Sequence, residues 1–308
     1  MSDQPTVSVI MNCLNGERFV RTAIESVYAQ TYPHWEIIFL DNASIDSTSA
    51  IVHNFDARIR YFRNQKTVLL GEARNQALQE ARGELIAFLD VDDYWYPAKL
   101  AMQVPLFEGR PDVGLVFSDC DLFADGSSHH RGYFKTHRYK PPRGNLYPAL
   151  LSHYAIPMLT TVIRRSQLVK MKEWFDNRFQ VCDDYDFFMR YAYICDADYI
   201  DLPLAAYRLH SEAATAKLYR LGPMERAQTL KKLRDNDLEF GSKYGRAAAT
   251  LEKDICFQQG KVLWREGNSS GARQYFLKHV LDPKFALAFG LSWISLHFLE
   301  RLRWRVGC

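Results

Sequence analysis

Short apolar runs alternate with helix-like segments throughout the first ninety residues of the chain. The apolar runs, residues 7–11, 35–40 and 85–89, are too short for helices and are predicted to be buried strands. Between them, residues 17–30 carry apolar side chains at helical spacing, and residues 71–81 form another helical segment. Strands and helices that alternate in such short units form an open, mostly parallel sheet with helices on both faces. The chain is therefore predicted to be an α/β protein.

Further segments extend this alternation. A helix is predicted at residues 44–53, and an edge strand at residues 58–63, where charged and apolar side chains alternate. Asn15 is expected to cap the first helix. More strands are predicted at residues 113–118 and 160–165.

Polar loops follow three of the predicted strands: residues 12–15, Asp41 and the segment that begins at Asp90. Ligands of open α/β sheets bind at the carboxyl ends of the strands. These three loops are therefore expected to converge on one crevice, and a functional site is predicted there.

Three carboxylates, Asp90, Asp92 and Asp93, occupy four positions directly after the buried strand at residues 85–89. Along an extended chain, Asp90 and Asp92 share one side, with Asp93 turning into the next loop. Such close like charges raise each other's pKa unless a cation lies among them. Carboxylate oxygens suit Mg²⁺ or Mn²⁺, which often bind one or two carboxylates together with substrate phosphates. A solvated acidic turn is the alternative, and these residues alone do not decide between the two.

The composition bounds the class of protein. The chain has 308 residues, 47% of them hydrophobic and 24% charged, and can bury a large core. Its net charge of +3 gives no indication of nucleic-acid binding. Six cysteines without a C-x-x-C pair indicate neither a zinc site nor a disulfide framework, and they fit a reducing cytosol. No signal peptide is recognised, and no apolar run reaches the ~18 residues of a membrane span, so a cytoplasmic location is expected.

The usual nucleotide-binding fingerprints are absent from the sequence. There is no G-x-G-x-x-G after the first predicted strand and no G-x-x-x-x-G-K-[ST]. A dinucleotide site and a P-loop are therefore disfavoured.

Four segments stand in an order that is typical of one enzyme family: residues 8–16 (SVIMNCLNG), 40–48 (LDNASIDST), 71–75 (GEARN) and 81–93 (ARGELIAFLDVDD). Together they resemble the successive signatures of family 2 glycosyltransferases of the GT-A fold, and the resemblance extends over roughly the first 210 residues. It implies a Rossmann-like GT-A sheet, a nucleotide-sugar donor and a divalent cofactor, Mn²⁺ or Mg²⁺.

The resemblance also implies roles for single residues. Asp41 corresponds to the carboxylate that accepts the N3–H of uracil, which suits a group that is acceptor-only when ionised. Arg74 corresponds to the basic residue near the base or diphosphate, and Asp90 to the carboxylate beside the ribose. The alternatives are a helix cap for Asp41 and a surface helix charge for Arg74.

The first loop departs from the family pattern. Asn12, Leu14 and Asn15 are expected to line the nucleotide site. Asn12 and Leu14 stand where the family often has proline and tyrosine, so base stacking there is expected to be weaker or displaced.

The resemblance places the metal on Asp92, with Asp93 as a further ligand. The metal would bridge the diphosphate and stabilise the leaving nucleotide. Residues 207–210, Tyr-Arg-Leu-His, resemble the closing element of the family, in which the histidine completes the metal shell or touches the diphosphate. His210 is thus a third candidate ligand, and a structural histidine is the alternative.

A second acidic cluster, Asp183, Asp184 and Asp186, opens a segment with a helical apolar face. It resembles the acidic pair of the family, usually Glu-Asp, followed by Tyr-Asp and a later arginine, here Arg190. Asp184 is implied to be the general base, with Asp183 as the fallback, because inverting transfer needs a base for the acceptor hydroxyl. The alternative is an acidic helix N-terminus favoured by the helix dipole.

The chain changes character after residue 215, and residues 216–308 are predicted to be helical. Residues 285–299 are apolar and are followed by Arg301, Arg303 and Arg305. An interfacial helix at residues 285–305 on an anionic membrane surface fits this pattern. A helix that packs on the catalytic domain is the alternative.

The sequence thus predicts a GT-A catalytic domain at residues 1–215, with a nucleotide-sugar half at about 1–120 and an acceptor half at about 121–215, and a helical region at 216–308. The predicted function is metal-dependent, inverting transfer of a sugar from a nucleotide-sugar, with a UDP-sugar as the favoured donor. The expected acceptor is a hydroxyl of a glycan or lipid-linked acceptor in bacterial surface polysaccharide synthesis. The expected location is the cytoplasm or the inner face of the cytoplasmic membrane. The alternatives are a metal-dependent nucleotidyltransferase and a non-catalytic nucleotide-binding or scaffolding protein.

Overall fold

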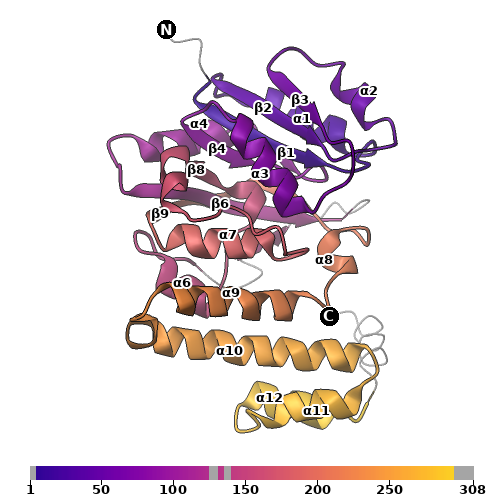
Figure 1. Ribbon diagram of the computed structural model, residues 1–308, viewed down its shortest axis with the longest axis vertical. Helices are drawn as coiled ribbons and strands as arrows, with labels where there is room; N and C mark the ends of the chain where they lie inside the picture. The colour runs from indigo at the N-terminus through magenta and orange to yellow at the C-terminus, as the bar shows by residue number, and fades with distance from the viewer. Residues whose placement is uncertain (1–4, 125–130, 135–139, 295–308) are drawn as a thin grey trace. The chain divides into compact units, whose positions relative to one another are not determined.

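The computed structural model describes residues 5–124, 131–134 and 140–294 (Figure 1). The chain divides into two compact units. Unit 1 comprises Met1–Leu150 and Tyr154–Ala213, and unit 2 comprises Leu151–His153 and Ala214–Cys308. Among the described residues, no helix has the length and apolar character to cross a membrane.

One sheet organises unit 1. Within the described residues its strands run in the order β3-β2-β1-β4-β8-β6-β9-β5, with β7 paired to β6. The first four strands are parallel to one another, β8 is antiparallel to both its neighbours, and β6 and β9 are parallel. The predicted α/β fold with a mostly parallel sheet is confirmed. The strands are β1 Val7–Cys13, β2 Trp35–Asp41, β3 Ile59–Arg63, β4 Leu85–Phe88, β5 Tyr94–Trp95, β6 Val113–Phe123, β7 Arg131–Gly132, β8 Val162–Arg164 and β9 Asp196–Arg208.

Helices cover both faces of this sheet, as Figure 1 shows. Alternate side chains of β1, such as Val9 and Met11, share a core with Ile24 of α1. On the other face, Phe88 of β4 packs edge-on against Phe187 of α7. The helices before residue 214 are α1 Val20–Tyr28, α2 Thr48–Val52, α3 Leu70–Glu80, α4 Lys99–Gln103, α6 Tyr147–Ser152 and α7 Asp183–Ala192, with 3-10 turns at Val104–Phe107, Met158–Thr160 and Arg165–Lys170.

Two local predictions were wrong. Asn15 does not cap α1, which begins only at Val20. Instead Asn15 adopts a positive φ of 56° and its Oδ1 accepts the N–H of Ile45 at 2.9 Å, which ties the loop after β1 to the loop after β2. The extended chain also ends at Phe88, so the alternation expected for the aspartates that follow does not apply.

Unit 2 is helical in its described part, as predicted for this region. Helix α10 packs against α9 on one side and α11 on the other, and α11 contacts α12. Its core joins Phe257 and Trp264 of α10 to Phe276 and Phe285. The predicted helix at residues 285–305 is α12 only as far as Leu291, and residues 295–305 lie outside the described residues. The helices are α8 Ala214–Lys217, α9 Gly222–Asn236, α10 Phe240–Arg265, α11 Ser269–Leu277 and α12 Pro283–Leu291.

Lys99 of α4 is a lysine whose side chain is buried inside unit 1. Its Nζ donates to Gln103 Oε1 at 2.7 Å and lies 4.1 Å from the centre of the Trp95 ring. No ion pair to Lys99 occurs among the described residues. Burial therefore lowers the pKa of Lys99 well below its ordinary value.

Lys99 is expected to make the stability of the protein pH-dependent. A lowered folded-state pKa contributes stability that is complete above the unfolded pKa and is lost as the pH falls through the folded pKa. The free energy of unfolding of the wild type should thus rise from pH 7 to pH 9.5, by up to about 1.4 kcal/mol per pH unit, relative to Lys99→Met. Urea unfolding at several pH values measures this difference. The exposed Lys172→Met is the matched control and should follow the wild type; parallel curves for Lys99→Met would contradict the burial argument.

Candidate active site

The loop after β4 carries the first acidic cluster. Beyond Phe88 the chain turns, and the turn is closed by the N–H of Asp93, which donates to the Asp90 carbonyl at 3.1 Å. Strand β5 follows at once and pairs with the last part of β9. This pairing brings the acidic loop to the end of β9, more than a hundred residues further along the chain.

Arg208, at the end of β9, holds the acidic loop in place. Its backbone N–H donates to Asp93 Oδ1 and its Nε to the Asp92 carbonyl, both at 2.8 Å. Its guanidinium lies 4.6 Å from the ring centres of both Phe19 and Phe123. The position of the loop is therefore fixed by a cation that is itself clamped between two rings.

Asp92 and His210 are brought together, as two ligands of one metal would be. Asp92 Oδ2 and His210 Nε2 are 2.9 Å apart, and both side chains are partly exposed. That distance is a hydrogen bond, and it also equals the separation of about 3 Å between neighbouring ligands of an octahedral ion with ~2.1 Å bonds. Burial, with the charge of Asp90, raises the pKa of Asp92. The donor atoms thus fit a small divalent cation.

Asp93 is not part of this pair. Its side chain is buried, and its Oδ1 accepts the backbone N–H of Arg208. Burial raises the pKa of Asp93 well above its ordinary value, and the charge of Asp92 adds to the effect. The structure places Asp93 as an anchor between the loop and β9.

Arg74 of α3 joins the first acidic cluster to the second. Its Nη1 donates to Asp183 Oδ2 at 2.6 Å, and its Nη2 donates to Asp90 Oδ1 at 3.0 Å. The Arg74 side chain is only 4% exposed, so it is not a surface helix charge. Its partners Asp90 and Asp183 come from different segments, and the guanidinium fork holds these segments together.

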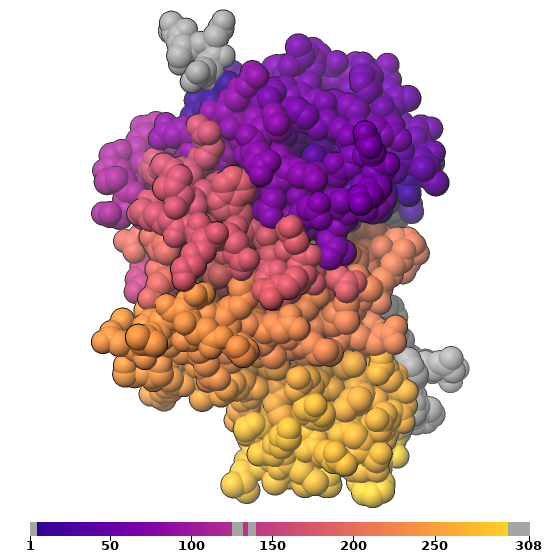
Figure 2. All heavy atoms as spheres, in the orientation of Figure 1, coloured from indigo at the N-terminus to yellow at the C-terminus, as the bar shows by residue number. Residues whose placement is uncertain are grey.

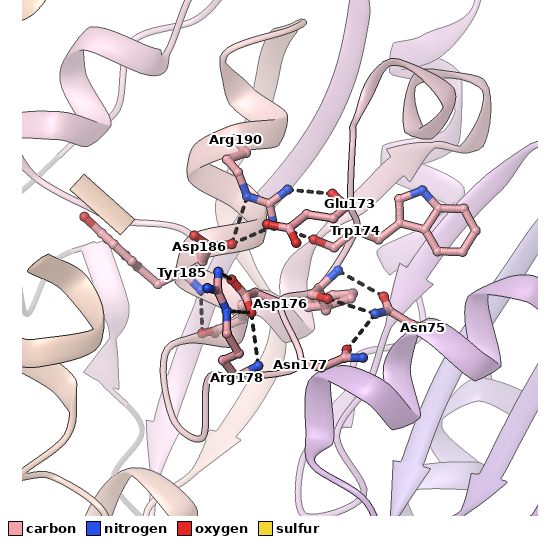
Figure 3. Close-up of polar contacts among 11 residues, drawn as sticks. Asn75, Glu173, Trp174, Asp176, Asn177, Arg178, Tyr185, Asp186 and Arg190 are labelled. Carbon is pink, nitrogen blue, oxygen red and sulfur yellow. Dashed lines mark hydrogen bonds and ion pairs between the residues drawn. The ribbon is translucent and has the colours of Figure 1, made fainter. Parts of the chain in front are cut away.

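Asn75, next to Arg74, fixes the segment that leads into α7 (Figure 3). Its Nδ2 donates to the Phe175 carbonyl at 2.8 Å, and its Oδ1 accepts the N–H of Phe175 at 3.0 Å. The same Nδ2 donates to Asn177 Oδ1 at 3.0 Å. Arg190 of α7 binds the Glu173 carbonyl at 2.6 Å, so both α3 and α7 grip this segment.

Glu173, Asp176 and Asp186 form an acidic triad whose ligand atoms lie within 4.8 Å of one another. Figure 3 shows why this triad is a poor cation site. Arg178 binds Asp176 and Arg190 binds Asp186, each at 2.6 Å. Two guanidinium groups thus offset two of the three carboxylates, and a metal ion would have to displace both.

Asp184 lies next to Asp183 at the start of α7, but its environment differs from that of Asp183. The Oδ1 of Asp184 accepts the N–H of Tyr185 at 2.6 Å, and the residue is half-buried. Among the described residues no cation pairs with Asp184. Burial and the charge of Asp183 raise the pKa of Asp184 to about 7, although Arg74 acts in the opposite direction. Asp183, by contrast, is buried in its ion pair with Arg74.

Asp41, at the end of β2, is engaged by protein groups. Its Oδ1 accepts the N–H of Ser44 at 2.7 Å and its Oδ2 accepts the Tyr61 hydroxyl at 2.6 Å. The side chain is fully buried. Asp41 closes the turn after β2 and does not cap α2, which begins at Thr48.

The three residues of the first loop that were expected to line the nucleotide site lie in different environments. Asn12 is buried, and its Nδ2 has no hydrogen-bond partner among the described residues. Leu14 is about half exposed. The N–H of Asn15 donates to Ser44 Oγ at 2.9 Å, which links this loop to the turn that Asp41 closes.

The sequence analysis gave no role to Arg208, Asn75 or Tyr61. Arg208 was visible only as the second residue of the Tyr-Arg-Leu-His element. Its partners Asp92 and Asp93 lie 116 and 115 residues away. Local sequence patterns do not report contacts over such separations, so no signal in the sequence could have found them.

The geometry is that of an α/β sheet with acidic loops at the strand ends, and comparisons with known proteins give its class. The family model described as Glycosyl transferase family 2 matches residues 8–167, more than half of the chain. The chain therefore belongs to glycosyl transferase family 2.

One curated relative is the UDP-Glc:alpha-D-GlcNAc-diphosphoundecaprenol beta-1,3-glucosyltransferase WfgD of Escherichia coli. It is 33% identical over 167 residues, which cover 54% of this chain and 63% of WfgD. The match thus spans less than two thirds of the length of that relative.

Solved structures share the fold. Staphylococcus aureus TarS (residues 1–349, with UDP-GlcNAc) superposes with a TM-score of 0.59 at 17% identity, over 93% of this chain and 90% of that chain. The mannosyltransferase PcManGT of Pyrobaculum calidifontis, in complex with GDP-Man and Mn²⁺, gives a TM-score of 0.61 at 16% identity, over 94% and 85%. The GT-A fold is confirmed.

Breaking the Arg74–Asp183 pair is expected to destabilise unit 1. Arg74→Met should lower the free energy of unfolding by about 3–5 kcal/mol, because it leaves a buried carboxylate without its cation. Adding Asp183→Asn to Arg74→Met should recover part of this loss, and a double-mutant cycle by denaturant unfolding measures the coupling. The exposed Arg82→Met, just beyond the end of the same helix, should stay within about 0.5 kcal/mol of the wild type. A loss for Arg74→Met no larger than that of Arg82→Met would contradict the buried-pair interpretation.

Proposed function

We propose that the chain is an inverting glycosyltransferase that moves a sugar from a nucleotide-sugar to a hydroxyl of an acceptor. Membership in glycosyl transferase family 2 supports the reaction class. The observation that carries the proposal is the pair of acidic clusters joined by Arg74. Asp90, Asp92 and Asp183 each have a side-chain partner, whereas Asp184 has none among the described residues.

Asp184 is the proposed general base. Its carboxylate would take the proton of the acceptor hydroxyl while that oxygen attacks the anomeric carbon, and the bond from this carbon to the diphosphate would break on the opposite face. A pKa of about 7 suits this task, because a base works best when its pKa lies near the working pH. Asp183, committed to Arg74, is the poorer candidate.

Asp92 and His210 are the residues proposed to hold a divalent cation, Mn²⁺ or Mg²⁺. When bound, such a cation supplies positive charge to the diphosphate of the leaving nucleotide. The complex of PcManGT with Mn²⁺ supports a divalent cofactor for a protein of this fold. Asp93 is proposed to orient the loop that carries Asp92.

The donor is proposed to be a UDP-sugar. WfgD is named for a UDP-Glc donor and TarS was solved with UDP-GlcNAc, whereas PcManGT was solved with GDP-Man. Asp41 is proposed to accept the uracil N3–H through a remaining lone pair, although its side chain is fully buried in this structure. Asn12, with its unpartnered Nδ2, and the exposed Leu14 are proposed to line the nucleotide site.

The acceptor is proposed to be a glycan or a lipid-linked glycan at the inner face of the cytoplasmic membrane, as in bacterial surface polysaccharide synthesis. The diphosphoundecaprenol acceptor in the name of WfgD supports this class. Nucleotidyl transfer and a non-catalytic role are the outcomes that turnover experiments would distinguish from sugar transfer.

Asp184→Asn is expected to lower kcat by about 10²–10⁴-fold without weakening donor binding, because it removes only the proton acceptor. In the wild type, kcat/KM should rise about tenfold per pH unit below pH 7 and level off above it, since the base works only when deprotonated. Donor hydrolysis or transfer to a soluble acceptor, followed from pH 5.5 to pH 9, measures both effects.

Asp183→Asn is the matched comparison. It removes a neighbouring negative charge, so the acidic limb of the Asp184 profile should move to lower pH while most activity remains. If the acidic limb of the pH profile disappears in Asp183→Asn while Asp184→Asn remains active, Asp183 and not Asp184 is the base.

Metal binding should depend on Asp92 and His210 and not on the acidic triad beside α7. Asp92→Asn and His210→Gln should each weaken Mn²⁺ binding at least ~10-fold in the presence of UDP, as loss of a ligand removes a large part of the site. Calorimetric titration with Mn²⁺ measures this, and a thermal shift with UDP that disappears on chelation supports it. Glu173→Gln is the control, and a loss of Mn²⁺ affinity in that variant alone would refute the assignment.

A further inference from the structure

Helix α12 of unit 2 is apolar on both of its faces. Phe285 and Ala288 are buried in the core that α12 shares with α10 and α11. The opposite face is exposed and carries no charge; in helical order and on into the turn that follows, it consists of Pro283, Ala286, Leu287, Gly290, Trp293 and Ile294. These residues follow the spacing of three and four that keeps side chains on one side of a helix.

The exposure of this face is large. Leu287 is 64% exposed and Trp293 71%, and Leu281, in the turn before α12, is 98% exposed. The residues of α11 and α12 form the yellow part of the surface in Figure 2. A helix that is apolar all round is normally covered, and a cluster of large exposed apolar side chains marks a surface with a partner.

Three cations flank the apolar face, and one of them, Lys284, also lies 3.6 Å from Asp254 of α10. Lys284 lies beside the face on α12, Lys278 precedes it, and Arg273 stacks on Trp293 with its guanidinium 3.9 Å from the ring centre. In the sequence, residues 269–294 contain three Lys or Arg and one Asp or Glu, a net charge of +2.

We propose that the exposed face of α12, with Leu281 and Trp293, docks on the surface of an anionic lipid bilayer. Leu281, Leu287 and Trp293 would enter the boundary between headgroups and acyl chains, and the three flanking cations would face the lipid phosphates. Tryptophan stacked with arginine suits that boundary, which is apolar on one side and wet and anionic on the other.

The charge pattern favours a bilayer over a second copy of the chain. Two copies that met through this face would bring their cationic rims together, and like charges oppose such a contact. The docking surface is complementary to an anionic layer instead. The proposal rests on the described residues up to Ile294, and it is independent of the proposed sugar transfer.

Vesicle co-sedimentation of the full chain, without donor or acceptor, tests the proposal. The wild type should bind vesicles of phosphatidylcholine and phosphatidylglycerol mixed in equal parts, at least ~10-fold more tightly than vesicles of phosphatidylcholine alone. Raising the salt from 50 to 500 mM should weaken this binding, because the electrostatic part is screened. No binding to the anionic vesicles would overturn the proposal.

Variants distinguish binding through the apolar face of α12 from non-specific binding to vesicles. Leu287→Ser with Trp293→Ser should weaken binding to the anionic vesicles at least ~10-fold, and Leu281→Ser alone should weaken it less. The matched control is Leu238→Ser, which changes a fully exposed leucine just before the N-terminal end of α10. This variant should bind as the wild type does. Equal loss in Leu238→Ser would refute the assignment to α12.

Two further measurements complete the test. Sedimentation equilibrium should find the same mass for the wild type and for the Leu287→Ser, Trp293→Ser variant; a wild-type dimer that the variant loses would assign the face to a second copy. Transfer to a water-soluble acceptor should persist in the variant. Loss of vesicle binding with transfer intact supports docking through α12, whereas absent transfer in a wild type that binds vesicles would count against the proposed function alone.

Discussion

The arrangement of the candidate site depends on the ion pairs of the buried Arg74 guanidinium. A buried guanidinium stays charged and needs carboxylate partners, and Arg74 is paired with Asp90 and Asp183, 16 and 109 residues away. These pairs require the loop after β4 and the start of α7 to meet at the N-terminal half of α3. Asn75 strengthens this junction by fixing the segment before α7. This part of unit 1 is thus held together by ion pairs as well as by its aromatic core.

A second arginine, Arg208, also fixes the loop after β4. Arg208 binds the loop after β4 through its backbone and its side chain, while two aromatic rings hold its guanidinium. Arg74 therefore contacts the beginning of the loop, at Asp90, and Arg208 its end, at Asp92 and Asp93. A loop fixed at both ends presents Asp92 and His210 to each other in a defined geometry, which is the condition for a metal site whose ligands come from distant segments.

The sequence predicted the parallel half of the sheet well, because strands at residues 7–11 and 35–40 and the helix at 71–81 are encoded by local periodicity. It did not predict β9, whose register with β6 shifts between Ser118 and Asp119 and which contains Pro203, a residue that weakens any strand pattern. Residue types indicated the acidic loops, but the directions of their side chains depend on the turn after Phe88 and on contacts over a hundred residues. For this reason Asp93 was expected beside a metal and instead anchors β9, and the roles of Arg74 and Arg208 could not be foreseen.

The distribution of cations assigns different tasks to carboxylates that are chemically alike. Arg74 offsets Asp90 and Asp183, and burial favours the neutral form of Asp93. Among the described residues, the imidazole of His210 is the side-chain partner of Asp92, and Asp184 makes no ion pair. Negative charge that protein cations do not offset is therefore concentrated at two positions, Asp92 and Asp184. The proposed reaction would use such charge at two positions, one to hold a divalent cation and one to accept a proton. The same ion pairs that stabilise the fold thus leave reactive the two carboxylates that the proposed reaction uses.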